Sequence, residues 1–371
     1  MLQTAAEPIT FEFNSGISPE KAERVITALG EEELPSRRVV LRFEGYPYVN
    51  AGVGWRIGNS LRRYCGELLE VGVPPLGGDW FRTFTRSCLG DAIAAYAGTI
   101  SCNGANVTAD IKDYYADKTV RCDQNAVVMG ELSRGLSVNP EQEDQFRKQF
   151  LGFFRYIGRD IRPALFDRDR LQDVVKLTFE AIQNVYDHAG RKPLPEGTRM
   201  MSYFLLGYYK TIEGQPDPTG RMQGYGKRLV DLTKRTRTDF VQVCVNDDGV
   251  GIAARQAQDP SIYWGPKEYE EKAVVDALTA RSSVKLRAQD SRVRGTPGQG
   301  YTYIESGLRA LHAFAVLRTG RLLAVLDGTD DASEGFTLVP GDFGYVPGTT
   351  LELLIPILKE GDGQPSLFPD E

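Results

Sequence analysis

The stretch FVQVCVNDDGVGI, residues 240–252, joins a run of apolar residues to a turn rich in glycine. The run has the length and composition of a buried strand, and acidic residues follow where that strand ends. A carboxylate at a strand end, followed by glycines, can accept a hydrogen bond from a flat ligand while the backbone passes close beside it. An Asp-Gly turn that only caps the strand is the alternative. Gly249 and Gly251 lack the third glycine of the dinucleotide-binding fingerprint, so the sequence does not predict that site.

A helical pattern before this strand carries three polar residues at a spacing of four. Glu180, Asn184 and His188 all lie within residues 167–189, and this spacing places their side chains on one helix face. The amide oxygen of Asn184 is a hard ligand of the kind that Mg²⁺ prefers, and Glu180 could take a proton from an attacking nucleophile. A polar helix edge that faces solvent is the alternative. For His188 we expect a hydrogen bond that orients the site.

Two further segments with glycines follow the strand. Residues 295–300, GTPGQG, come directly before a helical pattern at 301–311, and glycines at a helix start expose backbone N–H groups that favour phosphate. Gly348 and Thr349 lead into the last strand, where the Thr349 hydroxyl could complete a base pocket. Each segment alone is weak evidence, because 295–300 lacks the Gly-Lys-Ser/Thr ending of a P-loop.

The order of elements predicts an α/β protein with two domains. One long helix, a buried strand with a glycine turn, a second glycine turn and then antiparallel strands follow each other as in an α/β sandwich. We expect this domain over residues 139–357, with a smaller N-terminal α/β or α+β domain over 1–138. The remaining residues, 358–371, read as an acidic flexible tail.

Three local predictions accompany this division. The spacing of apolar residues predicts a single helix over 53–72 and an amphipathic helix over 141–158. The basic residues between 221 and 237, which precede the buried strand, are expected to lie on a solvated loop.

Composition and charge narrow the function classes. The chain has 371 residues, and its 44 lysines and arginines against 50 acidic residues give a net charge of −6, which argues against a protein that coats nucleic acid or an anionic membrane. The start, MLQTAAEPIT, lacks the pattern of a secretory signal, and no apolar run approaches the ~18 residues of a membrane span. Five scattered cysteines indicate reduced thiols, and two histidines argue against a zinc site. We therefore expect a cytoplasmic protein.

Taken together, the four segments resemble the N, G1, G2 and final-strand motifs of the GHKL ATPases. This superfamily includes gyrase, the heat-shock chaperone, histidine kinases and MutL, and the resemblance covers residues from about 140 to 357. It implies a C-terminal GHKL-type α/β sandwich, in which a mixed, largely antiparallel sheet is covered by helices. It also implies ATP and Mg²⁺ as cofactors.

The resemblance implies a role for each matching residue. Asn184 would hold Mg²⁺, Glu180 would be the general base, and Asp248 would bind the adenine amino group. The glycine turns would frame the lid and the phosphates, and Thr349 would support the aspartate through water. The residues expected to bind the nucleotide are Asn184, Asp248, Gly249, Gly251, Ile252, Gly298, Gly300 and Thr349.

The resemblance leaves the reaction open. The only histidines are His188 and His312, so no phosphoacceptor precedes the domain in this sequence, which argues against a histidine kinase. The segment EAIQNVYDHA, residues 180–189, looks most like the corresponding segment of the anti-sigma-factor serine kinases. We expect an ATPase that acts as an ATP-controlled conformational switch on a protein partner. The alternatives are a serine/threonine protein kinase of the anti-sigma-factor type and a regulatory module that binds ATP without hydrolysing it.

Partners are predicted only in outline. The domain that follows the ATPase in gyrase and MutL is not found after residue 357, so we expect slow turnover, or completion of the site by a partner or by an ATP-dependent homodimer. The N-terminal domain would then be the sensor or docking part, and its strand-then-helix pattern is compatible with a STAS-like module. Most basic residues between 281 and 294 are expected to face solvent, with contacts to phosphates or a partner as the alternative. Those between 221 and 237 could meet nucleic acid or an acidic protein face, but nothing else in the sequence supports a nucleic-acid partner.

Overall fold

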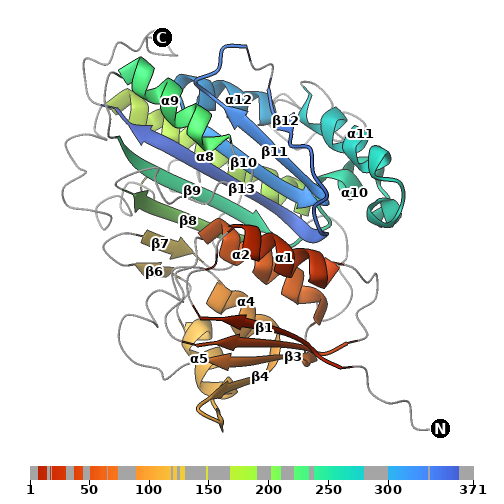
Figure 1. Cartoon of the computed structure of the whole chain (residues 1–371). Helices are drawn as coiled ribbons and strands as arrows, with labels where there is room; N and C mark the ends of the chain where they lie inside the picture. Colours follow the sequence, from red (N-terminus) through yellow and green to blue (C-terminus); the bar gives the residue numbers. More distant parts are fainter. Residues whose placement is uncertain are drawn as a thin grey trace. The chain divides into compact units, whose positions relative to one another are not determined.

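The computed structural model is an α/β protein that contains two β-sheets (Figure 1). The α/β class expected from the sequence is confirmed. The structure describes residues 7–14, 17, 19–30, 37–44, 51–64, 66–73, 89–117, 120–122, 126–129, 148, 168–189, 202–209, 221–233, 238–279, 300–332 and 335–358. No helix in these ranges is long and apolar enough to cross a membrane.

The chain divides into two compact units. Unit 1 comprises Met1–Arg121 together with the short segment Asp342–Pro347, and unit 2 comprises Cys122–Gly341 and Gly348–Glu371. The sequence-based domain boundary at residues 138 and 139 lies outside the described residues. So do the helix predicted over 141–158 and all of the predicted tail except Leu358, which is buried.

Unit 1 contains a five-stranded sheet in the order β1-β2-β3-β4-β5. The first four strands are parallel to one another, and β5 is antiparallel to β4. Parallel neighbours need crossover connections, and helices lie in these connections. The elements are β1 (Ile9–Phe13), α1 (Pro19–Gly30), β2 (Val39–Phe43), α2 (Ala51–Leu61), the 3₁₀ helix η1 (Arg62–Tyr64), β3 (Gly66–Val73), α4 (Leu89–Tyr96), β4 (Ala97–Cys102), β5 (Ala105–Asn106) and α5 (Thr108–Asp117).

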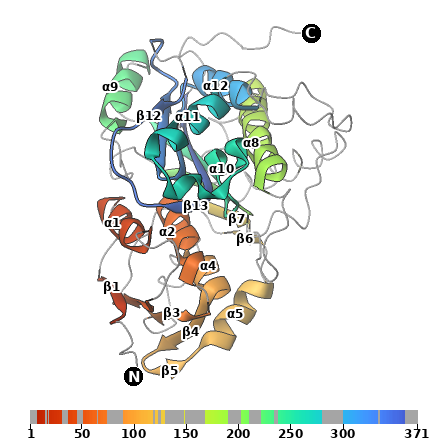
Figure 2. The same cartoon turned by 90° about the vertical axis from the view of Figure 1, so that its right-hand side faces the viewer.

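The two faces of the unit 1 sheet differ in character. Phe13, Leu41 and Val71 are fully buried, and Figure 2 shows α1, α2 and α4 together on one side of the sheet. Residues of opposite charge, more than a third exposed, alternate with these apolar side chains along the strands. Glu12 thus lies 3.7 Å from Arg42 on the neighbouring strand. Since side chains alternate between faces, the charged residues lie on the face opposite these helices.

The helix predicted over 53–72 is wrong in its second half. The helical segment ends at Tyr64, and β3 begins at Gly66. Gly66 has a φ of 73°, a left-handed conformation that ends a helix and that glycine adopts without strain. Beyond it, Leu69, Val71 and Val73 are buried in alternation, which is the period of a strand.

Unit 2 is built around an eight-stranded sheet in the order β12-β11-β10-β13-β9-β8-β7-β6. The pairs β12–β11, β11–β10, β13–β9, β9–β8 and β8–β7 are antiparallel. The strands are β6 (Val120–Cys122), β7 (Ala126–Met129), β8 (Ser202–Tyr209), β9 (Asp239–Asp247), β10 (Phe314–Gly320), β11 (Leu322–Asp327), β12 (Thr337–Leu338) and β13 (Val346–Ile357). The helices are α8 (Arg168–Ala189), α9 (Met222–Thr233), α10 (Ile252–Ala257), η3 (Pro260–Trp264), α11 (Lys267–Leu278) and α12 (Gly300–Ala310).

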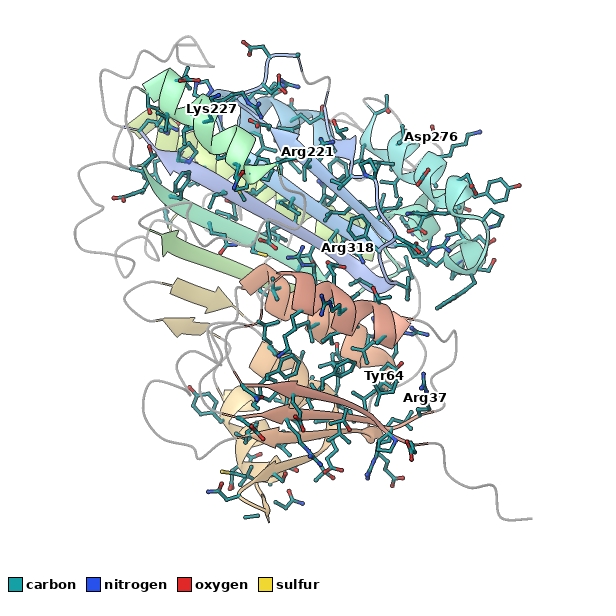
Figure 3. The ribbon with its side chains drawn as sticks, viewed as in Figure 1. Arg37, Tyr64, Arg221, Lys227, Asp276 and Arg318 are labelled. Atoms are coloured by element: carbon teal, nitrogen blue, oxygen red, sulfur yellow. The ribbon has the colours of Figure 1, made fainter. Side chains whose placement is uncertain are left out.

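Helices cover both faces of the central strands of this sheet. Figures 1 and 2 show α8 and α12 on one face and α9 on the other. Every residue of β9 after Asp239 is buried, and so is every residue of β10 and β11. Even Arg318 is fully buried among the strands (Figure 3), where its Nη1 donates to the Leu322 carbonyl at 3.2 Å.

Helix α9 occupies part of the segment where a solvated loop was expected, so that prediction is wrong. Its residues Met222, Tyr225 and Leu229 are buried. The Tyr225 hydroxyl donates to the His312 carbonyl at 2.9 Å, and its ring lies 5.2 Å from that of Phe314. The segment is polar overall, but its few apolar residues recur at helical spacing and pack on the sheet.

Candidate functional site

The last residue of β9 is a carboxylate that lies opposite the start of β13. Asp247 pairs in register with Thr349, and its Oδ1 accepts the Gly249 backbone N–H at 2.9 Å. Asp247 is 5% exposed, and the next residue, Asp248, is fully buried. Both acidic residues of the motif therefore lie below the protein surface. Buried charge of this kind is costly unless polar partners compensate it.

Gly251 occupies a position that no larger residue could take without displacing its neighbours. Its φ is 79°, and a Cβ added there would lie 2.3 Å from the Tyr263 hydroxyl oxygen. That hydroxyl donates to the Val250 carbonyl at 2.7 Å and accepts the Ala254 N–H at 3.2 Å. Tyr263 thus holds both sides of the turn, directly before Ile252 begins α10.

A hydroxyl from β10 joins this turn to the start of β13. The Thr319 Oγ1 accepts the Ile252 N–H at 3.0 Å, donates to the Gly348 carbonyl at 3.2 Å and lies 3.5 Å from the Thr349 Oγ1. Gly348 itself has a φ of 74°, and a Cβ there would lie 2.0 Å from the Asp247 carbonyl oxygen. The two predicted segments around Asp247 and Thr349 are therefore in direct contact.

Helix α12 brings its first turn to the same place. Burial raises the pKa of Tyr301, and the negative charge of Asp247 raises it further. The Tyr301 hydroxyl consequently keeps its proton and can donate a hydrogen bond beside that carboxylate. Gly300, predicted to bind nucleotide, is the first residue of α12, whereas Gly298 lies outside the described residues.

The position of α8 along the sheet follows from one arginine near its start. Arg170 Nη2 donates to the carbonyls of Pro356 and Leu311, each at 3.0 Å, and Pro356 pairs with Phe240 at the beginning of β9. Helix and strand pack against each other and run side by side (Figure 1). Asn184 follows Arg170 by fourteen residues, or about 21 Å of helix, and β9 covers that length in about six residues. Asn184 therefore lies level with the end of β9, where Asp247 is located.

Packing of α12 on α8 leads to the same alignment. Leu311, just after α12, lies beside Arg170, and a Cβ on Gly307 would lie 3.3 Å from the Leu177 Cδ1. The two helices are therefore antiparallel, and the start of α12 lies beside the second half of α8. Glu180 and Asn184 are in that half.

Asn184 has the surroundings expected of a residue that meets a ligand. It is half-buried, and among the described residues no group forms a hydrogen bond with its buried Nδ2 atom. A half-turn of the side chain exchanges the amide nitrogen and oxygen, so the same position can present an oxygen to a cation. The Glu180 side chain is also half-buried, and the side chain of His188 lies outside the described residues.

Helix α11, which follows α10 and η3, is fixed to the sheet by a buried ion pair. Glu270 on α11 is fully buried and accepts the Arg321 backbone N–H at 2.6 Å and its Nε–H at 2.8 Å. Burial raises the pKa of Glu270, while these hydrogen bonds act in the opposite direction. Gly320 leaves room for the carboxylate, since a Cβ there would lie 2.2 Å from the Glu270 Oε1.

The structure thus brings the predicted residues to one end of the unit 2 sheet. Gly249, Gly251, Ile252 and Thr349 are in or next to direct contact, with Asp248 beside Gly249 in the chain, and the start of α12 and the second half of α8 lie at the same level. Asp247, Tyr263, Thr319 and Tyr301 complete the arrangement and were not predicted to be site residues. Among the described residues, no three His, Cys, Asp or Glu side chains are grouped so that they could hold a metal ion. Neither a protein-family model nor a curated protein matches the chain.

Proposed function

We propose that unit 2 binds ATP with Mg²⁺ and hydrolyses it, and that this cycle acts as a conformational switch on a protein partner in the cytoplasm. The observation that carries the proposal is the convergence of the ends of β9 and β13, the Gly251 turn, the start of α12 and the second half of α8. These segments are the ones whose motifs resemble those of the GHKL ATPases. A hydrogen-bond acceptor for a purine base and an amide ligand for a cation therefore lie at one end of one sheet.

Asp247 is the carboxylate that we assign to the purine. It pairs with Thr349, and its charge acts on Tyr301 of α12, so it faces the helix layer that contains Asn184. Asp248, the residue expected from the sequence, follows after the strand has ended and is fully buried. An aspartate that accepts an N–H from an adenine amino group gives a short, charge-assisted hydrogen bond, and its loss should weaken binding markedly.

One residue is the candidate ligand of the cation, and another is the candidate acceptor of the proton. Mg²⁺ needs only one or two protein ligands when phosphates and water supply the others, and Asn184 fits that requirement through its amide oxygen. The ion would neutralise charge on the phosphates. Glu180 would accept the proton of the attacking nucleophile, which is water for an ATPase and a serine hydroxyl for a kinase.

Calorimetry with a non-hydrolysable ATP analogue and Mg²⁺ tests the binding site. We expect Asp247→Asn to weaken affinity at least tenfold, about 1.4 kcal/mol. Asp239→Asn, at the other end of the same strand, is the matched control and should bind as the wild type does. If Asp248→Asn bound the analogue much more weakly and Asp247→Asn bound it normally, Asp248 and not Asp247 would contact the purine. Wild-type protein that takes up no analogue would refute the proposal.

A second experiment tests the chemistry. Purified protein is incubated with γ-labelled ATP and Mg²⁺, alone and with cell lysate, and free phosphate is separated from labelled protein. We expect free phosphate, and we expect Glu180→Gln to bind the analogue but to release little phosphate. Label on a protein would instead indicate the kinase. Binding without either product would indicate a regulatory module.

A further inference from the structure

The short helix after the Gly251 turn begins without a side-chain cap of its own. The first N–H groups of a helix have no partner within it, and the Gly251 N-cap offers them no side-chain hydrogen bond. The Thr319 Oγ1 accepts the Ile252 N–H at 3.0 Å. The Tyr263 hydroxyl accepts the Ala254 N–H at 3.2 Å. Two hydroxyls from other segments of unit 2 thus take the place of the cap.

Each of these hydroxyls also donates to a carbonyl on the other side of the turn or beside it. Tyr263 donates to the Val250 carbonyl at 2.7 Å, and Thr319 donates to the Gly348 carbonyl at 3.2 Å. Thr319 is 1% exposed and Tyr263 is 2% exposed. A buried hydrogen bond costs more to break than it contributes on average, because the remaining partner is left unsatisfied. Loss of either hydroxyl should therefore loosen the turn.

The turn between β10 and β11 fixes both hydroxyls. Thr319 is the first of three consecutive residues in this turn. Gly320 follows with a φ of 55°, and a Cβ there would overlap the Tyr263 ring, so the ring packs against the turn. The Arg321 Nη2 donates to the Gly265 carbonyl at 3.0 Å, directly after the 3₁₀ helix η3 that carries Tyr263. The two hydroxyls are therefore held in place relative to each other.

We propose that Thr319 and Tyr263 are positioning residues for the candidate nucleotide site. Their hydroxyls hold the Gly251 turn in the conformation that accepts the nucleotide, before the nucleotide binds. The inference rests on the proposed function of unit 2. When only a fraction of the molecules has the competent turn, the apparent dissociation constant rises in inverse proportion to that fraction. Loss of either hydroxyl should thus weaken binding, although we assign neither side chain a contact with the ligand.

Calorimetry on the full chain, with the non-hydrolysable analogue and Mg²⁺, tests this role. Thr319→Val and Tyr263→Phe keep the shape of each side chain and remove its hydroxyl. We expect each to raise the dissociation constant roughly fivefold, which corresponds to one net hydrogen bond. Thr319→Ser keeps the hydroxyl and should bind nearly as the wild type does.

Helix α9, on the face of the sheet away from α8 and α12, offers matched controls (Figures 1 and 2). Tyr225 is fully buried and donates its hydroxyl to the His312 carbonyl at 2.9 Å. Thr233 is 7% exposed and donates to the Leu229 carbonyl at 2.8 Å. Tyr225→Phe and Thr233→Val should show the general effect of losing a buried hydroxyl and should bind the analogue as the wild type does. Equal losses of binding in these controls would contradict the inference.

Amide hydrogen exchange of the protein without nucleotide gives an independent measurement. We expect the Ile252 amide to exchange faster in Thr319→Val, and the Ala254 amide to exchange faster in Tyr263→Phe. Unchanged exchange, variants that bind like the wild type, or a Thr319→Ser variant that binds as weakly as Thr319→Val would each overturn the inference and leave the proposed function intact. Wild-type protein that binds no analogue would overturn both.

Discussion

The two sheets of this protein use polar residues in opposite ways. In unit 1, one face of a mainly parallel sheet carries paired charges that remain about half exposed, as in the pair Glu12–Arg42. In unit 2, the central antiparallel strands are buried on both faces and still contain Asn246, Asp247, Arg318 and Thr319, each at most 5% exposed. Solvated charges on an open face contribute little to stability. Buried polar groups cost free energy unless each finds a partner.

The difference shows where to look for function. A polar side chain in the unit 2 sheet has to be either paired within the protein or completed by a ligand. Asn246 accepts from the Thr350 hydroxyl at 2.6 Å, and Arg318 donates to strand carbonyls, so these two are accounted for. Asp247 accepts the Gly249 N–H and pairs in register with Thr349, at the end of the sheet where we propose that a ligand binds. The contrast between the two sheets can be tested by four sets of substitutions, of which the first should have the largest effect.

Removing the buried carboxylate of unit 2 should cause the greatest loss of stability. Glu270→Ala leaves both donors of Arg321 without an acceptor in an interior position. We expect the free energy of unfolding to fall by about 3–5 kcal/mol, measured by urea denaturation. Glu268→Ala, on the exposed side of the same helix, should stay within about 0.5 kcal/mol of the wild type. A loss below about 1 kcal/mol for Glu270→Ala would show that the buried pair resembles the exposed ones.

Two glycines with nearly the same φ angle should respond differently to alanine. Gly104 in unit 1 has a φ of 80° and open space where a Cβ would be, whereas Gly251 has a φ of 79° and the Tyr263 hydroxyl at 2.3 Å. We expect Gly104→Ala to cost about 1–2 kcal/mol, from backbone strain alone. Gly251→Ala should cost about 3 kcal/mol or more, since overpacking adds to the strain, and should abolish binding of the ATP analogue. If urea denaturation gave equal losses of unfolding free energy for the two variants, the Gly251 turn would have shifted to accommodate the Cβ.

We expect the change of stability in mild acid to arise in unit 2. Burial, helped by the charge of Arg170, lowers the pKa of His312 below its ordinary 6.5, although a hydrogen bond to Gly328 opposes the shift. The neutral form is thus favoured in the folded state, so stability is complete above pH 6.5 and falls as pH drops through the folded pKa.

His312→Asn should flatten this slope below pH 6.5. Asparagine tolerates the left-handed φ of 48° at this position, so the backbone should keep its conformation. Urea denaturation at a series of pH values measures the slope. An unchanged slope would assign it to other groups.

The exposed pairs of unit 1 should matter least. Glu70 lies 3.2 Å from Arg38, and their side chains are 37% and 54% exposed. We expect Glu70→Ala and Glu12→Ala each to lower the free energy of unfolding by less than about 1 kcal/mol, and salt should reduce even that effect. Denaturation in low and high salt measures both. Losses as large as that of Glu270→Ala would erase the distinction between the two sheets.

Local pattern predicted most elements of the fold, and it failed where two patterns overlapped. The strand at β9 and the long helix at α8 have continuous signals and were predicted. The segment at β3 continued an apparent helical spacing, and only the left-handed conformation of Gly66 separates helix from strand. Helix α9 was missed because Gly224, Gly226 and two basic residues interrupt its apolar pattern, and its buried residues gain their stability from packing on the sheet.

The sequence predicted the glycines and several polar residues of the candidate site, but not the residues that hold them in place. Gly251 and Thr349 lie in short motifs. Tyr263 and Thr319 hold these residues by hydroxyl contacts from separate segments, and no local spacing signals such contacts.

The division of the chain also limits how such a protein can be rearranged in evolution. Unit 1 takes six of its residues, 342–347, from far beyond the point where its main part ends. A gene fusion that cut after residue 121 would deliver the first unit without this piece, and the protein that kept unit 2 would retain a loop whose Gly344 no longer had α1 to pack on. Successful shuffling would therefore need both parts to travel together, so we expect the pair to be inherited as one block.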